Sequence, residues 1–314
     1  MTGRSTISVI LCTKDRPDEV RVVLQCLAGQ TRRPDEIIVV DGSRDDRTRR
    51  VVEEKALEPP LRYRHVTPPR LTRQRNVGLR EAAGALLLFV DDDVVLEPDY
   101  VEQVEAAFRE DAAGRIGAIQ GRVTNYLPPR TTFRARVRGR GLALLLRAFL
   151  LPRPGSGRFQ ASAFPTYPHG LTTPRFVEGL HGCAMSFRRE VFEDVRFDEA
   201  LAGAGDLDDA DIAYRLAARF RIRYEPRAQL RHLLSPVARD SAGIRARRQV
   251  LHHAYLLEAH GPLTWGRWLA GWWARLGLCV LYAAALDGES LRGGLSGIAA
   301  VLRRASPLGP RPAP

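Results

Sequence analysis

An α/β fold with a mainly parallel, doubly wound sheet is predicted for the first part of this 314-residue chain, on three observations. Short apolar runs alternate with amphipathic segments over roughly the first 125 residues, as in βαβ units. Several of these runs are hydrophobic at consecutive positions, which is typical of strands covered by helices on both faces. Polar or acidic residues follow them directly, and α/β sheets bind ligands at the carboxyl ends of their strands.

Hydrophobic spacing assigns the elements in order. Strands are expected where the runs are short and rich in Val, Ile and Leu, and helices where apolar residues recur every three or four positions. Val20, Val23, Leu24 and Leu27 show the helical spacing clearly. The expected strands are residues 7–12, 36–40, 61–66, 85–90 and 221–224, and the expected helices are residues 17–30, a charged helix from Thr48, residues 71–83 and residues 208–219.

Composition divides the chain into three stretches. Residues 1–236 carry the alternation of strands and helices and are predicted to form one α/β domain. Within them, residues 130–175 are rich in Arg, Pro and Gly and are interpreted as an inserted loop region without assigned elements. Residues 237–314 open on Arg239, Arg245, Arg247 and Arg248 and are predicted to form a basic, Trp-rich helical tail.

The formal net charge of +12 favours anionic partners, which include nucleic acid, acidic lipid headgroups and phosphorylated small molecules. Nucleic acid is not expected, because no nucleic-acid-binding motif or aromatic RNA-binding strand is present. The four cysteines form no C-x-x-C pair, which argues against a zinc site and against a disulfide framework. No signal peptide is visible at the N-terminus, so the catalytic part is expected in the cytoplasm.

Residues 263–286 combine all four tryptophans with two arginines, Arg267 and Arg275. The longest charge-free run, residues 276–286, is too short to span a bilayer, which requires about 20 apolar residues. A basic, Trp-rich helix is typical of the membrane interface, and the alternative is a helical hairpin that packs on the domain itself. The arginines that precede the tryptophans favour peripheral contact with the inner face of the cell membrane.

The strongest chemical signal is Asp91-Asp92-Asp93, directly after an apolar strand. Three adjacent carboxylates at the end of a buried strand repel one another unless a cation neutralises them. Oxygen ligands select a hard ion, so Mg²⁺ or Mn²⁺ is expected, and the alternative is a solvated acidic turn. Because side chains alternate along a strand, Asp91 and Asp93 are expected on one side and Asp92 on the other. Asp93 is the predicted direct metal ligand, with Asp91 nearer a ribose or a metal-bound water.

Further polar residues follow the other strands. Asp41 ends the second strand beside a glycine and suits a hydrogen bond to a base or a ribose, although D-G-S is also an ordinary turn. Arg75 and Asn76 lie near the start of a helix, where cations and free N–H groups bind phosphate, or they form a solvated basic face. Asp209 belongs to an acidic cluster that either caps a helix or supplies a general base. His232 lies beyond the last expected strand and is placed to reach back as a metal ligand, although a lone His is more often structural.

Taken in order, these motifs resemble glycosyltransferase family 2, the inverting enzymes of the GT-A fold. The similarity extends over roughly residues 5–236 and rests on the joint order and spacing of the motifs rather than on any one of them. The matching stretches are Ser8-Val9-Ile10 with Thr13 and Arg16-Pro17, Gln30 with Pro34 and Glu36 to Asp41, Gln74 to Gly78, Phe89 to Asp93, Gly182 with Arg188-Arg189, Phe197-Asp198-Glu199, Asp208 to Asp211 with Arg215-Leu216, and Pro226 with Ala228 and His232.

This resemblance implies a GT-A domain over residues 1–236 that transfers one sugar from a nucleoside-diphosphate sugar to a hydroxyl acceptor. Asp209 would be the catalytic base, Asp93 and His232 would hold the metal, and residues 130–175 would shape the acceptor site. A saccharide or lipid-linked acceptor in cell-envelope, polysaccharide or glycolipid synthesis would suit the basic tail. The residues implied to bind the nucleotide sugar are Thr13, Arg16, Asp41, Arg75, Asn76, Asp91 and Asp92.

The chain departs from the family pattern at three places. V-D-G-S stands where many members have V-D-D-G-S, and the usual E-D begins here with Asp208. The Q-x-x-R-W signature of processive synthases is missing, because Trp265-Gly266-Arg267-Trp268 has no Gln at the required place, which favours single-sugar transfer. Two rival interpretations remain, a sugar-phosphate nucleotidyltransferase and a non-catalytic, basic membrane-surface protein. The first lacks its Gly-rich loop, since Cys12 to Asp15 contains no glycine.

Overall fold

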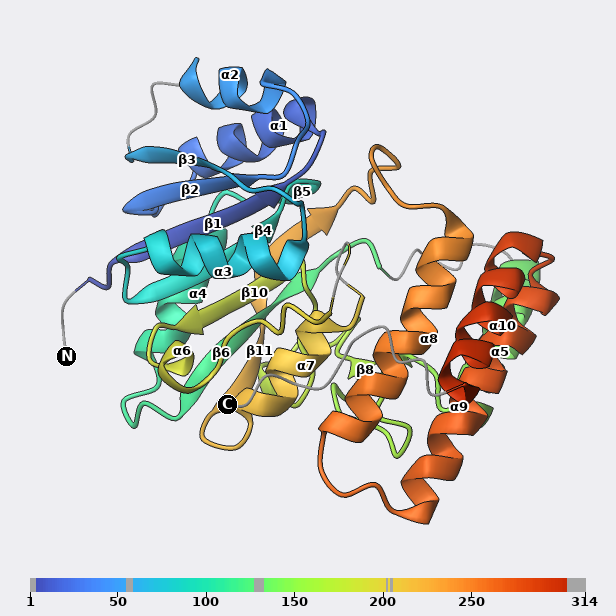
Figure 1. Ribbon diagram of the computed structural model, residues 1–314. Helices are drawn as coiled ribbons and strands as arrows, with labels where there is room; N and C mark the ends of the chain where they lie inside the picture. Colours follow the sequence, from blue (N-terminus) through green and yellow to red (C-terminus); the bar gives the residue numbers. More distant parts are fainter. Residues whose placement is uncertain (1–3, 55–58, 127–132, 202, 204–205, 304–314) are drawn as a thin grey trace.

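A mixed sheet forms the centre of the computed structural model, which describes residues 4–54, 59–126, 133–201, 203 and 206–303. Its strand order in the described residues is β3-β2-β1-β4-β10-β6-β11-β5, with β9 paired to β11 (Figure 1). β3, β2, β1 and β4 run parallel, whereas β10 is antiparallel to both β4 and β6. The bounds are β1 Ile7–Thr13, β2 Glu36–Asp41, β3 Leu61–His65, β4 Leu86–Asp91, β5 Val94–Leu96, β6 Ile116–Val123, β9 Arg175–Val177, β10 Ala184–Arg188 and β11 Arg221–His232.

The register of the parallel strands brings their carboxyl ends to one edge. Thr13 at the end of β1 lies beside Asp41 at the end of β2, and Cys12 lies beside Asp91 at the end of β4. β1, β2 and β4 are buried along nearly their whole length, because their Val, Ile and Leu side chains face helices on both sides. The polar residues that follow the strands therefore converge, as the sequence predicts.

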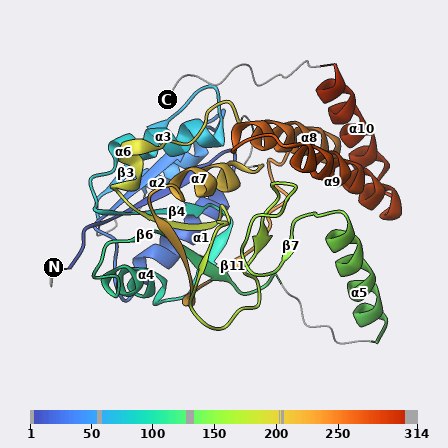
Figure 2. The same ribbon diagram turned by 90° about the horizontal axis from the view of Figure 1, so that it is seen from below.

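Helices cover both faces of the sheet (Figure 2). Alternation along β1 sends Val9 toward α1, α2 and α4, and Ile10 toward α3, α6 and α7. Ile212 and Leu216 of α7 are buried on the second face, as the helical spacing predicts. The bounds are α1 Pro17–Ala28, α2 Arg47–Glu53, α3 Leu71–Glu81, α4 Tyr100–Arg109, α6 Val191–Asp194 and α7 Asp208–Leu216.

The glycine of α3, Gly78, permits the closest helix–sheet approach at this edge. A Cβ placed on Gly78 would lie 2.4 Å from Cγ2 of Ile10 on β1. A side chain there would push α3 away from the sheet, and overpacking of this kind costs about 1–3 kcal/mol. The small residue thus keeps Gln74 and Arg75, one turn earlier on the same helix, close to the strand ends.

The C-terminal helices α8 Ala242–Ala259, α9 Trp265–Ala284 and α10 Gly288–Leu302 lie beside the sheet domain (Figure 1). Buried apolar residues of α8 and α9 form one cluster with residues of the domain, among them Leu207 and Ala210 at the start of α7. The helices are also joined to the domain by polar contacts from α8: the Nδ1 atom of His252 lies 2.7 Å from the carbonyl of Asp206, and Nε2 of His253 lies 2.6 Å from that of Ser162. Gly271 and Leu278 of α9 are buried. The helical tail therefore packs on the domain, which was one of the two alternatives.

Residues 133–175 contain more regular structure than the sequence indicates. A helix, α5 Phe133–Ala148, is followed by the strand pair β7 Arg153–Pro154 and β8 Thr166–Tyr167. Residues 130–132 of the expected insertion lie outside the described residues. The end of α5 contacts α9, since Phe149 stacks on Trp273 with ring centroids 4.8 Å apart. None of the described helices has the length and apolarity to cross a bilayer.

Candidate active site

A cavity of about 560 Å³ opens at the carboxyl edge of the sheet. Its walls come from the ends of β1, β4 and β11, from the start of α7, and from the segment that leads from β11 into α8. Acidic and basic side chains dominate the lining, so the cavity suits a charged, polar ligand. Among the charged and hydrogen-bonding residues of the lining are Thr13, Lys14, Arg16, Gln74, Arg75, Asp91, Asp92, Asp93, Tyr126, His181, Asp206, Asp208, Asp209, His232, Arg239, Asp240, Arg245 and Arg248.

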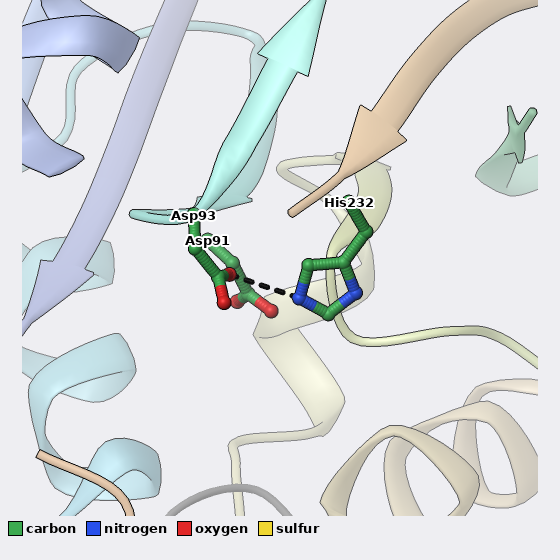
Figure 3. A group of neighbouring side chains, drawn as sticks. All are labelled: Asp91, Asp93 and His232. Atoms are coloured by element: carbon green, nitrogen blue, oxygen red, sulfur yellow. Dashed lines mark hydrogen bonds and ion pairs between the residues drawn. The ribbon is translucent and has the colours of Figure 1, made fainter. Parts of the chain in front are cut away.

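Asp91, Asp93 and His232 form a group whose potential ligand atoms lie within 4.8 Å of one another (Figure 3). His232 ends β11 and pairs with Val94 on β5, directly after the acidic trio, which brings the imidazole to the carboxylates. Its Nε2 lies 2.9 Å from Oδ1 of Asp93. Burial raises the pKa of Asp91. Burial is the largest single effect on Asp93 and acts to raise its pKa, but the hydrogen bond and charge of His232, the charge of Arg16 and the backbone of Ser235 together lower the pKa of Asp93.

The donor set fits a divalent cation. Two carboxylates and one imidazole supply oxygen and nitrogen ligands, a combination that Mn²⁺ accepts readily and that is less typical of Mg²⁺. The other ring nitrogen of His232, Nδ1, contacts the hydroxyl of Tyr126, and such a contact fixes the ring orientation of a metal ligand. The partner that fixes the ring comes from the loop after β6, a segment to which the sequence assigns no role.

Asp92 points away from this group, as the alternation of the strand predicts. One oxygen accepts a 2.7 Å hydrogen bond from the hydroxyl of Thr13, and the other accepts a 2.7 Å charged hydrogen bond from Arg16. Burial raises the pKa of Asp92 to about 7 against the opposing effect of Arg16. Asp92 therefore ties the loop after β1 to the end of β4, and the three predicted residues lie together in the cavity wall.

Asp209 at the start of α7 also lines the cavity. Its Oδ2 accepts a 3.0 Å hydrogen bond from the backbone N–H of Gly182, and its Oδ1 accepts one of 2.8 Å from Ala210. Burial, followed by the nearby charge of Asp208, raises the pKa of Asp209 to about 7. A carboxylate with that pKa is well matched to proton transfer near neutral pH. Asp211, two residues on, faces Arg215 and His260 instead.

Arg75 lies between the two acidic groups. Its guanidinium forms a buried ion pair with Asp208 and lies 3.5 Å from Oδ1 of Asp91. The charge therefore links the end of β4 to the start of α7 across the cavity wall. Gln74, its neighbour, donates from Nε2 to the carbonyls of Thr13 and Val40 at 2.8 and 2.9 Å and fixes the ends of β1 and β2 together.

Two predicted binding residues, Asp41 and Asn76, lie outside the cavity lining. Asp41 is fully buried; its Oδ1 accepts from the backbone of Ser43 and its Oδ2 from the hydroxyl of Tyr63, each at 2.8 Å. The amide of Asn76 bonds both backbone groups of Phe197, at 2.9 and 3.1 Å. Asn76 thus positions the loop before α7 in this structure.

The family model described as "Glycosyl transferase family 2" matches residues 8–196. That stretch is more than half of the chain and contains the trio at the end of β4. The chain belongs to glycosyl transferase family 2. The predicted family is thereby confirmed.

Curated relatives of this family 2 chain align over parts of their length. An uncharacterized glycosyltransferase of Haemophilus influenzae is 36% identical over 98 residues, 31% of this chain and 33% of the relative. The O-antigen biosynthesis protein RfbC of Myxococcus xanthus is 26% identical over 223 residues, 69% of this chain and 16% of the relative. The validoxylamine A glucosyltransferase of Streptomyces hygroscopicus subsp. limoneus is 34% identical over 116 residues, which are 35% of this chain and 25% of the relative. The chain thus spans about a third or less of these relatives.

Two solved structures share the GT-A architecture of this family 2 chain. A mannosyltransferase from Pyrobaculum calidifontis, solved in complex with GDP-Man and Mn²⁺, superposes with a TM-score of 0.54 at 19% identity, covering 98% of this chain and 83% of that one. Residues 1–349 of S. aureus TarS, solved in complex with UDP, superpose with a TM-score of 0.53 at 17% identity, covering 88% of this chain and 72% of that one. Likeness at this identity establishes the fold, and the predicted fold class is confirmed.

In this family 2 chain, several cavity residues escape sequence reasoning. Arg239, Arg245 and Arg248 appear in the sequence only as the basic start of the tail, yet all three line the cavity. Arg248 pairs with Asp206 and, at 2.7 Å, with Asp240. Because these arginines precede a tryptophan-rich helix, the sequence suggests that they contact a membrane surface. No local sequence pattern indicates that α8 begins beside the carboxyl ends of the strands. The density of arginines there was the one available signal.

Proposed function

We propose that the protein is an inverting glycosyltransferase that moves a single sugar from a nucleoside-diphosphate sugar to a hydroxyl acceptor. The observation that carries the proposal is the juxtaposition, in one cavity, of a metal-type group and a buried carboxylate. Asp91, Asp93 and His232 supply the first, and Asp209, with a pKa of about 7, supplies the second. Direct displacement of a diphosphate requires these two functions on opposite sides of the anomeric carbon.

Asp93 and His232, with Asp91 beside them, would hold Mg²⁺ or Mn²⁺. The ion would supply positive charge to the departing diphosphate. The protein's own cations can add to this charge, since Lys14, Arg16 and Arg75 line the same cavity. Thr13, Arg16 and Asp92 form one bonded cluster at the end of β1, which is a ready contact surface for the nucleotide sugar. Asp41 and Asn76 would not contact the nucleotide sugar directly. Asp41 would stabilise the turn at Ser43, and Asn76 would position the loop at Phe197.

Asp209 would remove the proton from the acceptor hydroxyl as that oxygen attacks. Its two backbone hydrogen bonds orient the carboxylate toward the cavity, and burial keeps the pKa high enough for it to take a proton. Arg75 holds Asp208 aside in an ion pair. Only one of the two adjacent carboxylates is therefore available as the base.

The acceptor is proposed to be a saccharide or a lipid-linked molecule of the cell envelope. Relatives and neighbours with names such as "O-antigen biosynthesis protein" support this class of acceptor. The helical region offers a surface for membrane contact from the cytoplasmic side, because one stripe of α9 is exposed and apolar: Trp265, Leu269, Trp273, Leu276 and Val280.

The stripe continues on α5, where Leu142, Leu144 and Leu145 are exposed. Nε1 of Trp273 donates a 2.7 Å hydrogen bond to the carbonyl of Ala148, which joins the two helices. No acidic residue occurs in the sequence between Asp111 and Glu178 or between Glu258 and Asp287. An apolar, acid-free surface of this kind is complementary to anionic lipid headgroups.

Binding of nucleotide sugars tests the proposal directly. Thermal-shift measurements against a panel of nucleoside-diphosphate sugars with Mn²⁺ should find at least one that stabilises the protein, and Mn²⁺ chelation should remove the effect. Incubation with nucleoside triphosphates and sugar 1-phosphates is the companion assay. Release of pyrophosphate in that assay, without binding of any nucleoside-diphosphate sugar, would identify a nucleotidyltransferase instead.

A further inference from the structure

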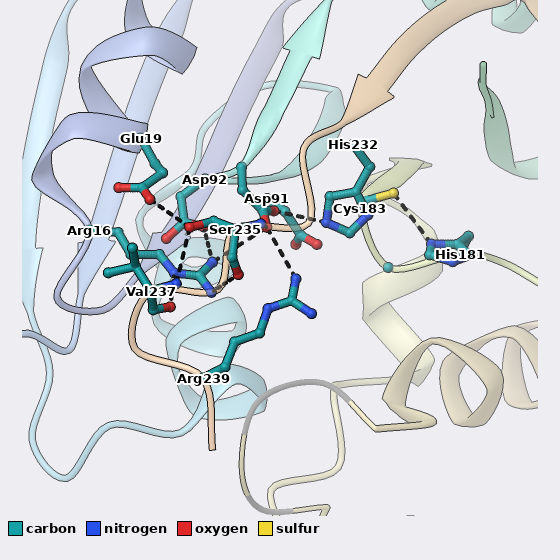
Figure 4. A network of polar contacts seen from close by, with 12 residues as sticks. Arg16, Glu19, Asp91, Asp92, His181, Cys183, His232, Ser235, Val237 and Arg239 are labelled. Atoms are coloured by element: carbon teal, nitrogen blue, oxygen red, sulfur yellow. Dashed lines mark hydrogen bonds and ion pairs between the residues drawn. The ribbon is translucent and has the colours of Figure 1, made fainter. Parts of the chain in front are cut away.

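The segment between β11 and α8, residues 233–240, lies across the acidic trio; we call it the strap (Figure 4). The backbone of Ser235 donates a 2.9 Å hydrogen bond to Oδ2 of Asp93, and its hydroxyl donates one of 2.7 Å to Glu19. Arg16 donates from Nε to the carbonyl of Val237 at 2.9 Å. The first part of the strap is therefore tied both to α1 and to the predicted metal ligand.

Arg239, the last residue but one of the strap, is held much less firmly. Its Nη2 lies 3.4 Å from Oδ2 of Asp93, and Asp93 is its only ion-pair partner among the residues that the structure describes. A third of the Arg239 side chain, 34%, is exposed in the cavity wall. Arg16, by comparison, pairs with Asp92 at 2.7 Å and bonds two strap carbonyls. Arg239 can therefore leave Asp93 without breaking a network.

Electrostatic repulsion from a bound metal would favour movement of Arg239 away from Asp93. A divalent cation on Asp91, Asp93 and His232 would lie next to the guanidinium, and like charges at such a distance repel. A diphosphate in the same cavity carries several oxygens, and the planar fork of arginine binds phosphate oxygens with paired hydrogen bonds. The same side chain is thus unfavourable beside the bare ion and favourable beside the ion with its diphosphate.

We propose that Arg239 is a diphosphate-binding residue that neutralises Asp93 until metal and donor arrive together. This inference rests on the proposed function, because it requires a cation and a diphosphate at this edge of the sheet. It makes metal and donor binding cooperative. Moving Arg239 away from Asp93 breaks an ion pair, and only a bound phosphate offers the guanidinium new hydrogen bonds that offset this loss of free energy. It also gives the strap a role in donor binding, because the hydrogen bonds of Ser235 and Val237 fix the backbone from which the Arg239 side chain extends.

Removal of the guanidinium should therefore have two effects of opposite sign. In Arg239→Gln, Mn²⁺ alone should bind about threefold or more tightly, because a competing cation has gone. Pyrophosphate should bind the Mn²⁺-loaded protein about tenfold more weakly, because a charge-assisted contact has gone. Arg239→Lys, which keeps the charge without the fork, should leave Mn²⁺ affinity nearly unchanged and restore only part of the pyrophosphate affinity.

The experiment uses the full chain, with Mn²⁺ affinity from electron paramagnetic resonance and pyrophosphate affinity from calorimetry. Arg247→Gln is the matched control, because Arg247 is exposed, lies on α8 directly after the strap and does not line the cavity. That control should change neither affinity. If Arg239→Gln leaves both affinities unchanged, or weakens Mn²⁺ binding, Arg239 is a structural partner of Asp93 and the inference is wrong. A wild-type chain that binds neither Mn²⁺ nor pyrophosphate would overturn the metal site itself.

Discussion

His232 and Asp93 are 139 residues apart in the chain, yet Nε2 of one lies 2.9 Å from Oδ1 of the other. The pairing of β11 with β5 produces this contact, because it lays the last residue of β11 beside the turn that follows β4. A metal bound here would therefore bridge an early and a late part of the sheet. Metal binding should report on the integrity of the whole domain.

The first prediction concerns the metal site. Asp93→Ala removes one of two carboxylates from the ligand group, so Mn²⁺ affinity should fall by about a hundredfold and sugar transfer should be abolished. Asp92→Asn is the matched control, since Asp92 bonds Thr13 and Arg16 rather than the ligand group, and it should keep Mn²⁺ binding within about tenfold of the wild type. Near-normal turnover in Asp93→Ala would refute the metal assignment.

The second prediction separates the base from donor binding. Asp209→Asn keeps the shape of the side chain but removes its ability to take a proton, so turnover should drop by roughly 10²- to 10⁴-fold. Donor affinity, measured by calorimetry with Mn²⁺ present, should stay within about threefold, because the proposed nucleotide contacts lie at the ends of β1 and β4. A collapse of donor affinity instead would assign Asp209 to the binding site.

The third prediction is a pH dependence with a defined sign. Asp209 must be ionised to act as a base, and its pKa is raised to about 7, so kcat/KM should decrease about tenfold per pH unit below that value. The charge of Asp208 is one cause of the raised pKa. Asp208→Asn should therefore move the acidic limb of the profile to lower pH.

A second cavity carboxylate, Asp92, could also produce an acidic limb in the pH profile. The pKa of Asp92 is also raised to about 7, but Arg16 and Asp93, not Asp208, are the charges that act on it. A limb that stays in place in Asp208→Asn would therefore not belong to Asp209. Circular dichroism of the variant is needed alongside, because Asp208 pairs with the buried Arg75, and breaking such a pair costs about 3–5 kcal/mol.

The fourth prediction concerns the exposed stripe of α9. Replacing Trp265 and Leu269 by Ser should reduce cosedimentation with vesicles that contain anionic lipid about tenfold, because both side chains are exposed and apolar. Binding of the wild type should also weaken as salt increases. Val22→Ser is the control, since Val22 is an exposed apolar residue of α1 on the sheet domain. Equal binding by all three proteins would mean that the stripe does not contact lipid.

The acidic trio was predictable in detail because strand geometry is local. Extending the alternation of the strand through the trio predicts that Asp92 faces away from Asp91 and Asp93. The structure has this arrangement, although β4 ends at Asp91 and the other two carboxylates lie in the turn that follows. The full length of β11 was not predicted: the expected strand covers residues 221–224, whereas β11 continues to His232 through an irregular pairing between Glu225 and Gln229. The antiparallel β10 was equally hidden, since Ala184–Arg188 is short and its direction depends on its neighbours.

The cavity wall contributed by the tail shows a different limit of sequence reasoning. Arg248 reaches the cavity because α8 docks against the loop before α7, through contacts such as that of His252 with Asp206, and Arg239 reaches it because the strap is bonded to Asp93 at Ser235. Composition describes such arginines as basic, but only tertiary packing determines what they face. The same applies to Tyr126, whose contact with His232 joins the loop after β6 to the end of β11, a contact that the sequence gives no reason to expect.

Because α8 both carries cavity arginines and packs with α9, the proposed recognition of the donor and the proposed attachment to a membrane surface would share one structural unit. An exchange of the C-terminal helices between relatives would replace part of the wall that faces the leaving group together with the tryptophan face. Selection on either property therefore constrains the other. Divergence in where such an enzyme resides should be accompanied by change in which donor it accepts.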